Sequence, residues 1–112
     1  MLFLILCAML LPYALPDLCG NDELVETVSP NGKLKAVSFR RSCGATTGYS
    51  THVAILPAAK RLPNEPGNTF VADDEVTVIA RWLDDQQLII SGGATGAIRR
   101  EASVRRVQIV YE

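Results

Sequence analysis

Turn-forming residues interrupt this chain so often after residue 28 that no long helix fits between them. The clearest turn is Ser29-Pro30-Asn31-Gly32, where proline suits the second position and Asn-Gly accepts positive φ. Further connections rich in Gly, Pro, Thr or Asp lie at 42–48, 57–67, 73–75, 84–86 and 92–96. Segments this short between turns are typical of β-strands.

The segments between the turns have the side chains that strands prefer. In residues 33–41, Val37 and Phe39 alternate with polar side chains, which predicts a strand. Residues 49–56 predict the next strand, with Tyr49, Thr51, Val53 and Ile55 on one face and the residues between them on the other. Residues 68–72 predict a short edge strand. Residues 76–83 are β-branched and contain Trp82, which predicts a central strand with the tryptophan in the core.

The clearest hairpin joins 76–83 to 87–91 through the polar turn 84–86, and the alternating residues 107–111 predict a last strand. Connections this short favour antiparallel neighbours. The sequence therefore predicts a mainly β fold, a small antiparallel β-meander or sandwich of five to six strands after an N-terminal signal helix.

That signal helix is expected in residues 1–16, an apolar segment without a charged side chain. Its unbroken run from Met1 to Leu11 has the length of a signal-peptide core and falls short of the roughly 20 residues that cross a membrane. We expect 17–112 to form a single β-rich domain. No Lys or Arg precedes Lys33, which is atypical of a signal peptide, so an uncleaved N-terminal membrane segment and a buried helix remain alternatives.

The three cysteines bear on export as well. Cys7 lies in the apolar segment and is lost if that segment is cleaved, which leaves Cys19 and Cys43 with one way to pair. A disulfide closing a loop of about 25 residues stabilises a domain by about 3 kcal/mol in the chain-entropy model. A reactive thiol or a metal ligand is the alternative, but two cysteines and one histidine are too few for a zinc site. We expect a disulfide and an extracytoplasmic location, periplasmic or secreted.

Length and charge restrict the range of functions. A chain of 112 residues allows one domain, and 48% hydrophobic with 21% charged residues is ordinary for a globular protein. The net charge of −1 creates no field that would attract nucleic acid. We expect no cofactor, no metal and no nucleic-acid partner, and membrane contact only through an uncleaved N-terminal segment.

The stretch 40–49 concentrates arginines, glycines and threonines. Its backbone N–H groups and threonine hydroxyls, with charge from an arginine, are able to hold an anion. It is not a P-loop, because no lysine follows the second glycine and no helix is expected after it. A disulfide-anchored turn, with threonines bonded to the backbone, is the favoured interpretation. The candidate binding residues are Arg40, Arg41, Thr46, Thr47, Tyr49 and His52.

A hydrolase that uses residues 43–48 is a less favoured alternative. Cys43 and His52 would have to form a thiol–imidazole pair, and an oxidised cysteine supplies no thiolate. His52 falls on the strand face opposite Val53 and Ile55, so we expect it to be exposed to solvent. We assign no catalytic residue.

Two charged regions remain. The carboxylates of 73–75 and 84–85 match no calcium loop in spacing and predict solvated turns. The four arginines of 99–106 suit an anionic envelope polymer or lipid head group, or the exposed face of an edge strand, where charge prevents aggregation. We favour the edge strand.

Several short motifs together resemble those of a family of small uncharacterised bacterial exported proteins. They are an early cysteine at 19, Ser-Pro-Asn-Gly at 29–32, Cys-Gly-Ala-Thr-Thr-Gly at 43–48, Gly-Asn-Thr-Phe at 67–70 and Trp-Leu-Asp-Asp at 82–85. The resemblance covers about 19–90 and depends mostly on the segment at 43–48. It implies an extracytoplasmic location and supplies no activity.

These observations favour a non-enzymatic exported β-domain that binds an envelope protein or an anionic ligand. An inhibitor or immunity-type protein that blocks another protein with an exposed loop is the main alternative.

Overall fold

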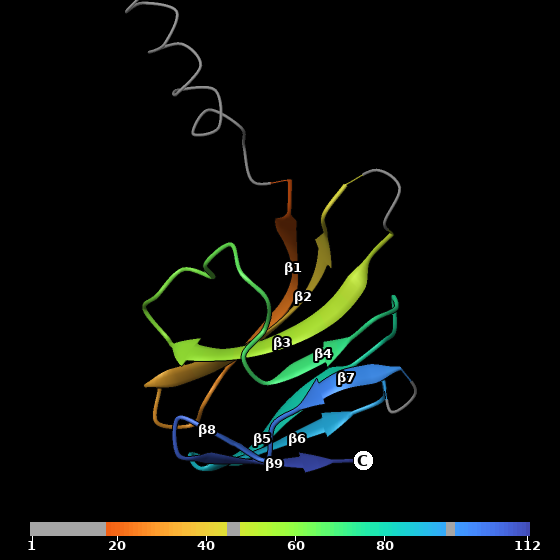
Figure 1. Cartoon of the computed structure of the whole chain (residues 1–112). Coiled ribbons are helices and arrows are strands. Elements are labelled where there is room, and N and C mark those ends of the chain that lie inside the picture. The colour runs from red at the N-terminus through yellow and green to blue at the C-terminus, as the bar shows by residue number, and fades with distance from the viewer. Residues whose placement is uncertain (1–17, 45–47, 94–95) are drawn as a thin grey trace, which may run out of the picture.

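The computed structural model describes residues 18–44, 48–93 and 96–112, and these form strands and loops without a helix (Figure 1). Within these ranges no helix has the length and apolar character of a membrane span. The expected signal helix lies outside the described residues. The strands are β1 Gly20–Val28, β2 Leu34–Ser42, β3 Ser50–Pro57, β4 Phe70–Ala72, β5 Ile79–Asp84, β6 Gln87–Ser91, β7 Ala97–Arg100, β8 Ser103–Val104 and β9 Val107–Tyr111.

The mainly β prediction is confirmed, and the strand number is corrected from five or six to nine within the described residues. The strands form two sheets. The first has the order β1-β2-β3-β4-β7 and is antiparallel throughout. The second has the order β5-β6-β9-β8. A meander would place chain neighbours side by side, whereas the chain here leaves the second sheet after β6, adds β7 to the first sheet and then returns.

That excursion makes β9 parallel to β6, which the sequence did not predict. Parallel neighbours require a crossover connection, and residues 92–106 with β7 and β8 provide it. The predicted β5–β6 hairpin is confirmed, with its turn between Asp84 and Gln87. The predicted turn at 29–32 is also confirmed, because it joins β1 to β2 and Gly32 adopts φ 76°.

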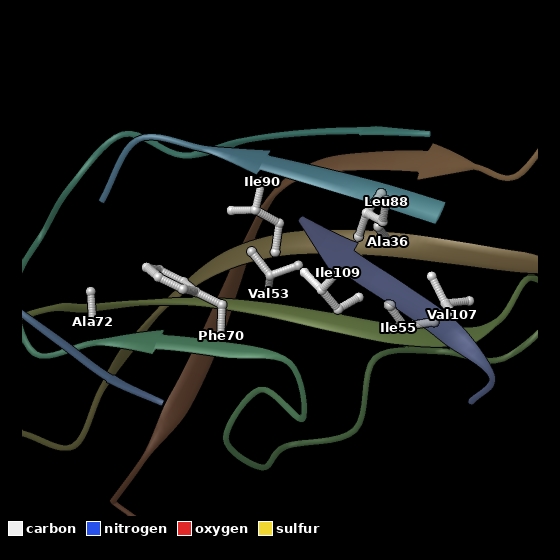
Figure 2. Close-up of a cluster of buried hydrophobic side chains, with 9 residues drawn as sticks. All are labelled: Ala36, Val53, Ile55, Phe70, Ala72, Leu88, Ile90, Val107 and Ile109. Carbon is white, nitrogen blue, oxygen red and sulfur yellow. The ribbon is translucent and has the colours of Figure 1, made fainter. Parts of the chain in front are cut away.

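The main core lies between the two sheets, as Figure 2 shows. Phe70 is fully buried and faces the second sheet, which contributes Leu88 and Ile90 from β6 and Val107 and Ile109 from β9. Ala36, Val53, Ile55 and Ala72 complete the cluster. Two sheets packed over one apolar layer make a β-sandwich.

A second apolar cluster covers the other face of the first sheet, called the outer face from here on. Val37 and Phe39 of β2 pack there with Ala54 and Leu56 of β3, and Leu62 of the segment 58–69 lies over them. A Cβ atom on Gly67 would lie 2.6 Å from the Val53 carbonyl oxygen, so only glycine allows this approach of the segment to β3. Strands β2 and β3 are therefore buried on both faces.

Two strand positions differ from the prediction. Residues 76–83 were expected to form a central strand, but β5 begins at Ile79 and is an edge strand with Ile79 63% exposed. Its β-branched composition reflects strand propensity rather than full burial. Trp82 is half-buried against the core, as expected. Residues 70–72, within the expected edge strand 68–72, form β4, which lies inside the first sheet between β3 and β7.

Candidate functional site

The predicted disulfide is present. Cys19 and Cys43 are bonded directly beyond the last backbone pair of β1 and β2, which is Gly20 with Ser42. The bridge therefore closes the open end of this hairpin, and it ties the first described residues to the sandwich. Cys7 lies outside the described residues.

The six candidate binding residues do not form one site. Arg40 and Arg41 are neighbours on β2, so their side chains leave opposite faces of the sheet. Arg41 shares the outer face with His52, while Arg40 and Tyr49 meet elsewhere. Thr46 and Thr47 lie outside the described residues.

Arg41 is buried and serves the fold. Its guanidinium donates hydrogen bonds to the Oδ1 atoms of Asn21, at 2.8 Å, and Asn64, at 3.0 Å. The Asn21 side chain in turn donates to the carbonyl oxygens of Pro63 and Glu65. Arg41 thus fixes the segment 58–69 to β1 and β2, and its Nη1 atom is bonded to protein groups.

His52 lies on the predicted face, but the prediction that it is exposed is wrong. It is 3% exposed, because the segment 58–69 covers it, and it stacks on Phe39 with ring centroids 5.0 Å apart. The Gly67 N–H donates to Nδ1 at 2.9 Å. Burial, and secondarily the charge of Arg41, lowers the pKa of His52 to about 4.

The bond from Gly67 also determines the tautomer of His52. A neutral imidazole with an acceptor at Nδ1 has its proton on Nε2, and Nε2 lies 2.7 Å from Ser50 Oγ. We assign Nε2 as the donor to Ser50, whose hydroxyl donates to the Arg41 carbonyl oxygen. This arrangement has no base aimed at the serine, and the Cys43 sulfur is held in the disulfide. Neither pair has the geometry of an activated nucleophile.

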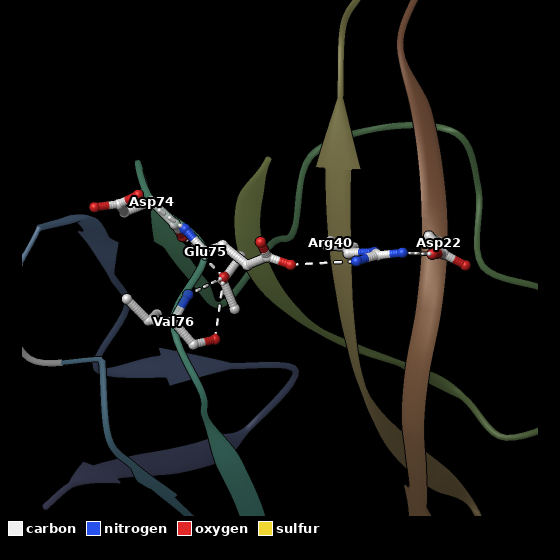
Figure 3. A network of polar contacts seen from close by, with 6 residues as sticks. Asp22, Arg40, Asp74, Glu75 and Val76 are labelled. Carbon is white, nitrogen blue, oxygen red and sulfur yellow. Dashed lines mark hydrogen bonds and ion pairs between the residues drawn. The ribbon is translucent and has the colours of Figure 1, made fainter. Parts of the chain in front are cut away.

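Arg40, near the end of β2, and Tyr49, directly before β3, lie against each other. The Arg40 guanidinium lies 4.4 Å from the centroid of the Tyr49 ring. Figure 3 shows the same guanidinium between Asp22 of β1, at 2.8 Å, and Glu75, at 3.2 Å. This ion pair network joins β1 and β2 to the segment that precedes β5, at one end of a groove.

The groove runs between β1 and the extended segment 75–78 that precedes β5. We call it the inner hollow; its volume is about 380 Å³, and its walls include Leu24, Val25, Val76 and Val78. A smaller space of about 70 Å³ continues it past Thr27 and Ala80. The side chains of Leu24 and Val25 are 54% and 60% exposed. The sandwich is open to solvent on this side.

A second groove, the outer hollow, lies on the other face of β1. Its volume is about 550 Å³, and it separates Glu23 and Glu26 of β1 from Lys60 and Arg61 of the segment 58–69. Lys35 Nζ lies 3.3 Å from the Glu26 carboxylate. A hydrogen bond with Glu26, then desolvation and the Glu26 charge, raise the pKa of Glu23 above its usual value.

Between the two hollows is the free edge of β1. In the described part of the chain β1 pairs only with β2, so its other edge has no strand beside it. The register shifts between Glu23 and Val25, which makes Leu24 a β-bulge. The second sheet reaches this strand through Trp82, whose Nε1–H donates to the Thr27 carbonyl oxygen at 3.0 Å.

The predicted charged regions separate in space. Arg99 and Arg100 lie on β7, an edge strand of the first sheet, as favoured from the sequence. Arg105 and Arg106 instead occupy the turn between β8 and β9 with φ of 51° and 65°, and Arg105 Nε donates to the Ile55 carbonyl oxygen at 3.1 Å. Among residues 18–44, 48–93 and 96–112 no three Asp, Glu, His or Cys side chains are grouped as metal ligands.

Sequence reasoning missed the residues that form the two hollows. In residues 21–27, Leu24 and Val25 are adjacent and flanked by carboxylates, so the segment has no alternation and no strong strand signal. Val76 and Val78 were assigned to a central strand, where they would be covered. Only the strand order shows that both segments lie at edges.

The fold is a two-sheet β-sandwich braced by one disulfide. Comparison with models of protein families finds no match, and comparisons with curated proteins and with solved structures find none.

Proposed function

We propose that this protein is an exported, disulfide-braced β-sandwich that acts by binding a partner along the edge of β1. The observation that carries the proposal is the open side of the sandwich, where an unpaired strand edge runs between two hollows of about 380 and 550 Å³. Sheet edges that stay open are templates for a further strand.

Three observations support the extracytoplasmic location. Disulfides persist in oxidising compartments, and Cys19 is bonded to Cys43. Residues 1–16 have the composition of a signal segment, and the resemblance to bacterial exported proteins implies the same location. Mass spectrometry of the mature protein tests this proposal: we expect an N-terminus before Cys19 and a mass two hydrogens below that of the reduced chain. A retained N-terminal segment with free thiols would contradict it.

Binding is favoured over hydrolysis because the polar side chains around His52 are already bonded within the protein. Arg41, Ser50 and His52 all bond to protein groups. Throughout the described ranges, every buried side-chain nitrogen and oxygen atom has a hydrogen-bond partner. A catalytic site would present such atoms to a substrate instead.

Photo-crosslinking in the producing cell tests the binding role. A benzoylphenylalanine at position 25 would lie in the inner hollow, and one at position 110 would lie on β9, where Val110 is 45% exposed on the far side of the second sheet. We expect a discrete adduct with the probe at 25 and none with the probe at 110. Absence of an adduct at 25, or equal adducts at both positions, would contradict the proposal.

A further inference from the structure

We propose that the occupant of the β1 edge is an extended peptide segment in which apolar residues alternate with Lys or Arg. This inference deepens the proposed function and depends on it. A strand added beside β1 would direct alternate side chains into the inner and outer hollows, because successive side chains leave opposite faces. The two hollows differ in chemistry, so they require different side chains.

The backbone of β1 offers the first interaction. The edge of β1 that faces away from β2 is unpaired in the described structure. Near its end, Trp82 Nε1–H donates to the Thr27 carbonyl oxygen at 3.0 Å. The edge from Gly20 to Glu26 is therefore the part open to a ladder of hydrogen bonds. The disulfide at Cys19 holds the start of this edge against β2.

The inner hollow selects apolar side chains. Leu24 and Val25 form one wall, and Val76 and Val78 form the other. Both β1 residues are more than half exposed, at 54% and 60%. Every second side chain of an added strand would cover them, and removal of this apolar surface from water favours binding.

The β1 wall of the outer hollow favours a cation in a strand added beside it, whereas Lys60 and Arg61 form the opposite wall, in the segment 58–69 that covers β2 and β3. Glu23 and Glu26 point to this side, and their mutual hydrogen bond with like charge raises the pKa of Glu23. Lys35 compensates Glu26 at 3.3 Å. A Lys or Arg directly across from Glu23 would form the opposite-charge pair that stabilises neighbouring strands.

The same carboxylates disfavour a second copy of this chain. Antiparallel pairing of two β1 strands about Leu24 and Val25 would bring Glu23 of one copy opposite Glu26 of the other. Like charges directly opposite each other destabilise a strand pair. The apolar segment 1–16 has no cation to offer either. The carboxylates and the β-bulge of this edge therefore disfavour a second copy of the chain and the segment 1–16, and they favour a basic strand.

Synthetic peptides test the inference on the purified, oxidised mature protein. The probe is a fluorescein-labelled peptide of about nine residues, the length of β1, with alternating Val and Lys. The matched peptide alternates Val and Glu. We expect fluorescence anisotropy to show at least about tenfold tighter binding of the Val/Lys peptide at low salt, and a smaller preference at high salt because screening weakens exposed charge pairs.

Substitutions of three exposed residues separate the contributions of the inner hollow and of Glu23 to peptide binding. Val25→Glu should weaken Val/Lys binding at least about tenfold, because it places a charge in the inner hollow. Glu23→Lys should reduce or reverse the preference between the peptides. Val110→Glu, on the far face of the second sheet, should change neither. Circular dichroism and thermal unfolding verify that each variant is folded.

Several results would overturn the inference. They are no binding of the Val/Lys peptide to the folded protein, equal binding of both peptides, and a preference that Glu23→Lys leaves unchanged. A dimer in sedimentation equilibrium that Val25→Glu dissociates would identify a second copy as the occupant. If the position-25 crosslink forms but the peptide preference is absent, only this inference fails. If the crosslink is absent, the proposed function fails and the inference fails with it.

Discussion

The two sides of the β1–β2 hairpin differ in how they meet solvent. On the outer face of β2 and β3, the segment 58–69 covers Phe39 and His52, which are 0% and 3% exposed. On the inner face near β1, the second sheet stops short, and Leu24 and Val25 remain more than half exposed. Both sides have apolar residues on strands. Whether an apolar side chain is buried therefore depends on which segment of the chain covers its strand. Substitutions on the covered side should cost more stability than substitutions on the open side.

The largest expected effect is on the covered side. Phe39→Ala removes a fully buried ring that stacks on His52 and belongs to the apolar cluster of the outer face. Large-to-small changes of this kind cost about 4 kcal/mol of unfolding free energy. Urea unfolding followed by circular dichroism measures it. A loss below about 1 kcal/mol would mean that the segment 58–69 does not seal this face.

The disulfide comes next. The Cys19→Ser, Cys43→Ser double variant should lose about 3 kcal/mol, since the bridge constrains a separation of 24 residues in the unfolded chain. Reduction of the wild-type protein should lower the free energy of unfolding, measured by urea unfolding, by the same amount. Agreement between the two measurements would show that the effect comes from the bond and not from the serines.

Acid should destabilise the covered side through His52. The pKa of His52 is about 4 in the fold and has its ordinary value of 6.5 in the unfolded chain, so the unfolded state takes up a proton first as the pH falls. This contribution is complete above pH 6.5 and is lost towards pH 4, amounting to about 2 kcal/mol between pH 7 and pH 5. Urea midpoints across this range measure it. His52→Gln serves as the control, since that variant should lack this part of the pH dependence.

The smallest effect is expected on the open side. Val25→Ala should change the unfolding free energy by less than about 0.5 kcal/mol, because the side chain is 60% exposed. The same substitution should still weaken peptide binding. A large stability loss at Val25 would erase the contrast between the two sides and indicate that the inner hollow is part of the core.

The features that the sequence predicted correctly are local ones. The turn at 29–32 and the hairpin at 84–86 depend on a few adjacent residues, and the pairing of Cys19 with Cys43 follows from a count. The exposure of His52 was mispredicted because it depends on a segment that returns from 15 residues along the chain to bond Nδ1. The edge position of β5 was missed for the same reason, since no local pattern states which strands become neighbours.

The inner hollow shows most clearly that local sequence patterns do not determine which strands become neighbours. Leu24 and Val76 are separated along the chain, and they face each other only because β1 and the segment before β5 end up on the same side of two different sheets. Their residue types allow either burial or exposure. Strand order decides between the two, and it is a property of the whole chain.

The parallel pair formed by β6 and β9 has a consequence for the order of folding. Leu88 and Ile90 of β6 share the core with Val107 and Ile109 of β9, so the centre of the second sheet stays incomplete until the chain beyond residue 107 is available. Non-local contacts of this kind form slowly. Pulsed hydrogen exchange during refolding should show late protection of the β6 amides. A chain whose core is completed this late stays unfolded while it is synthesised. Translocation channels accept polypeptides in this unfolded state.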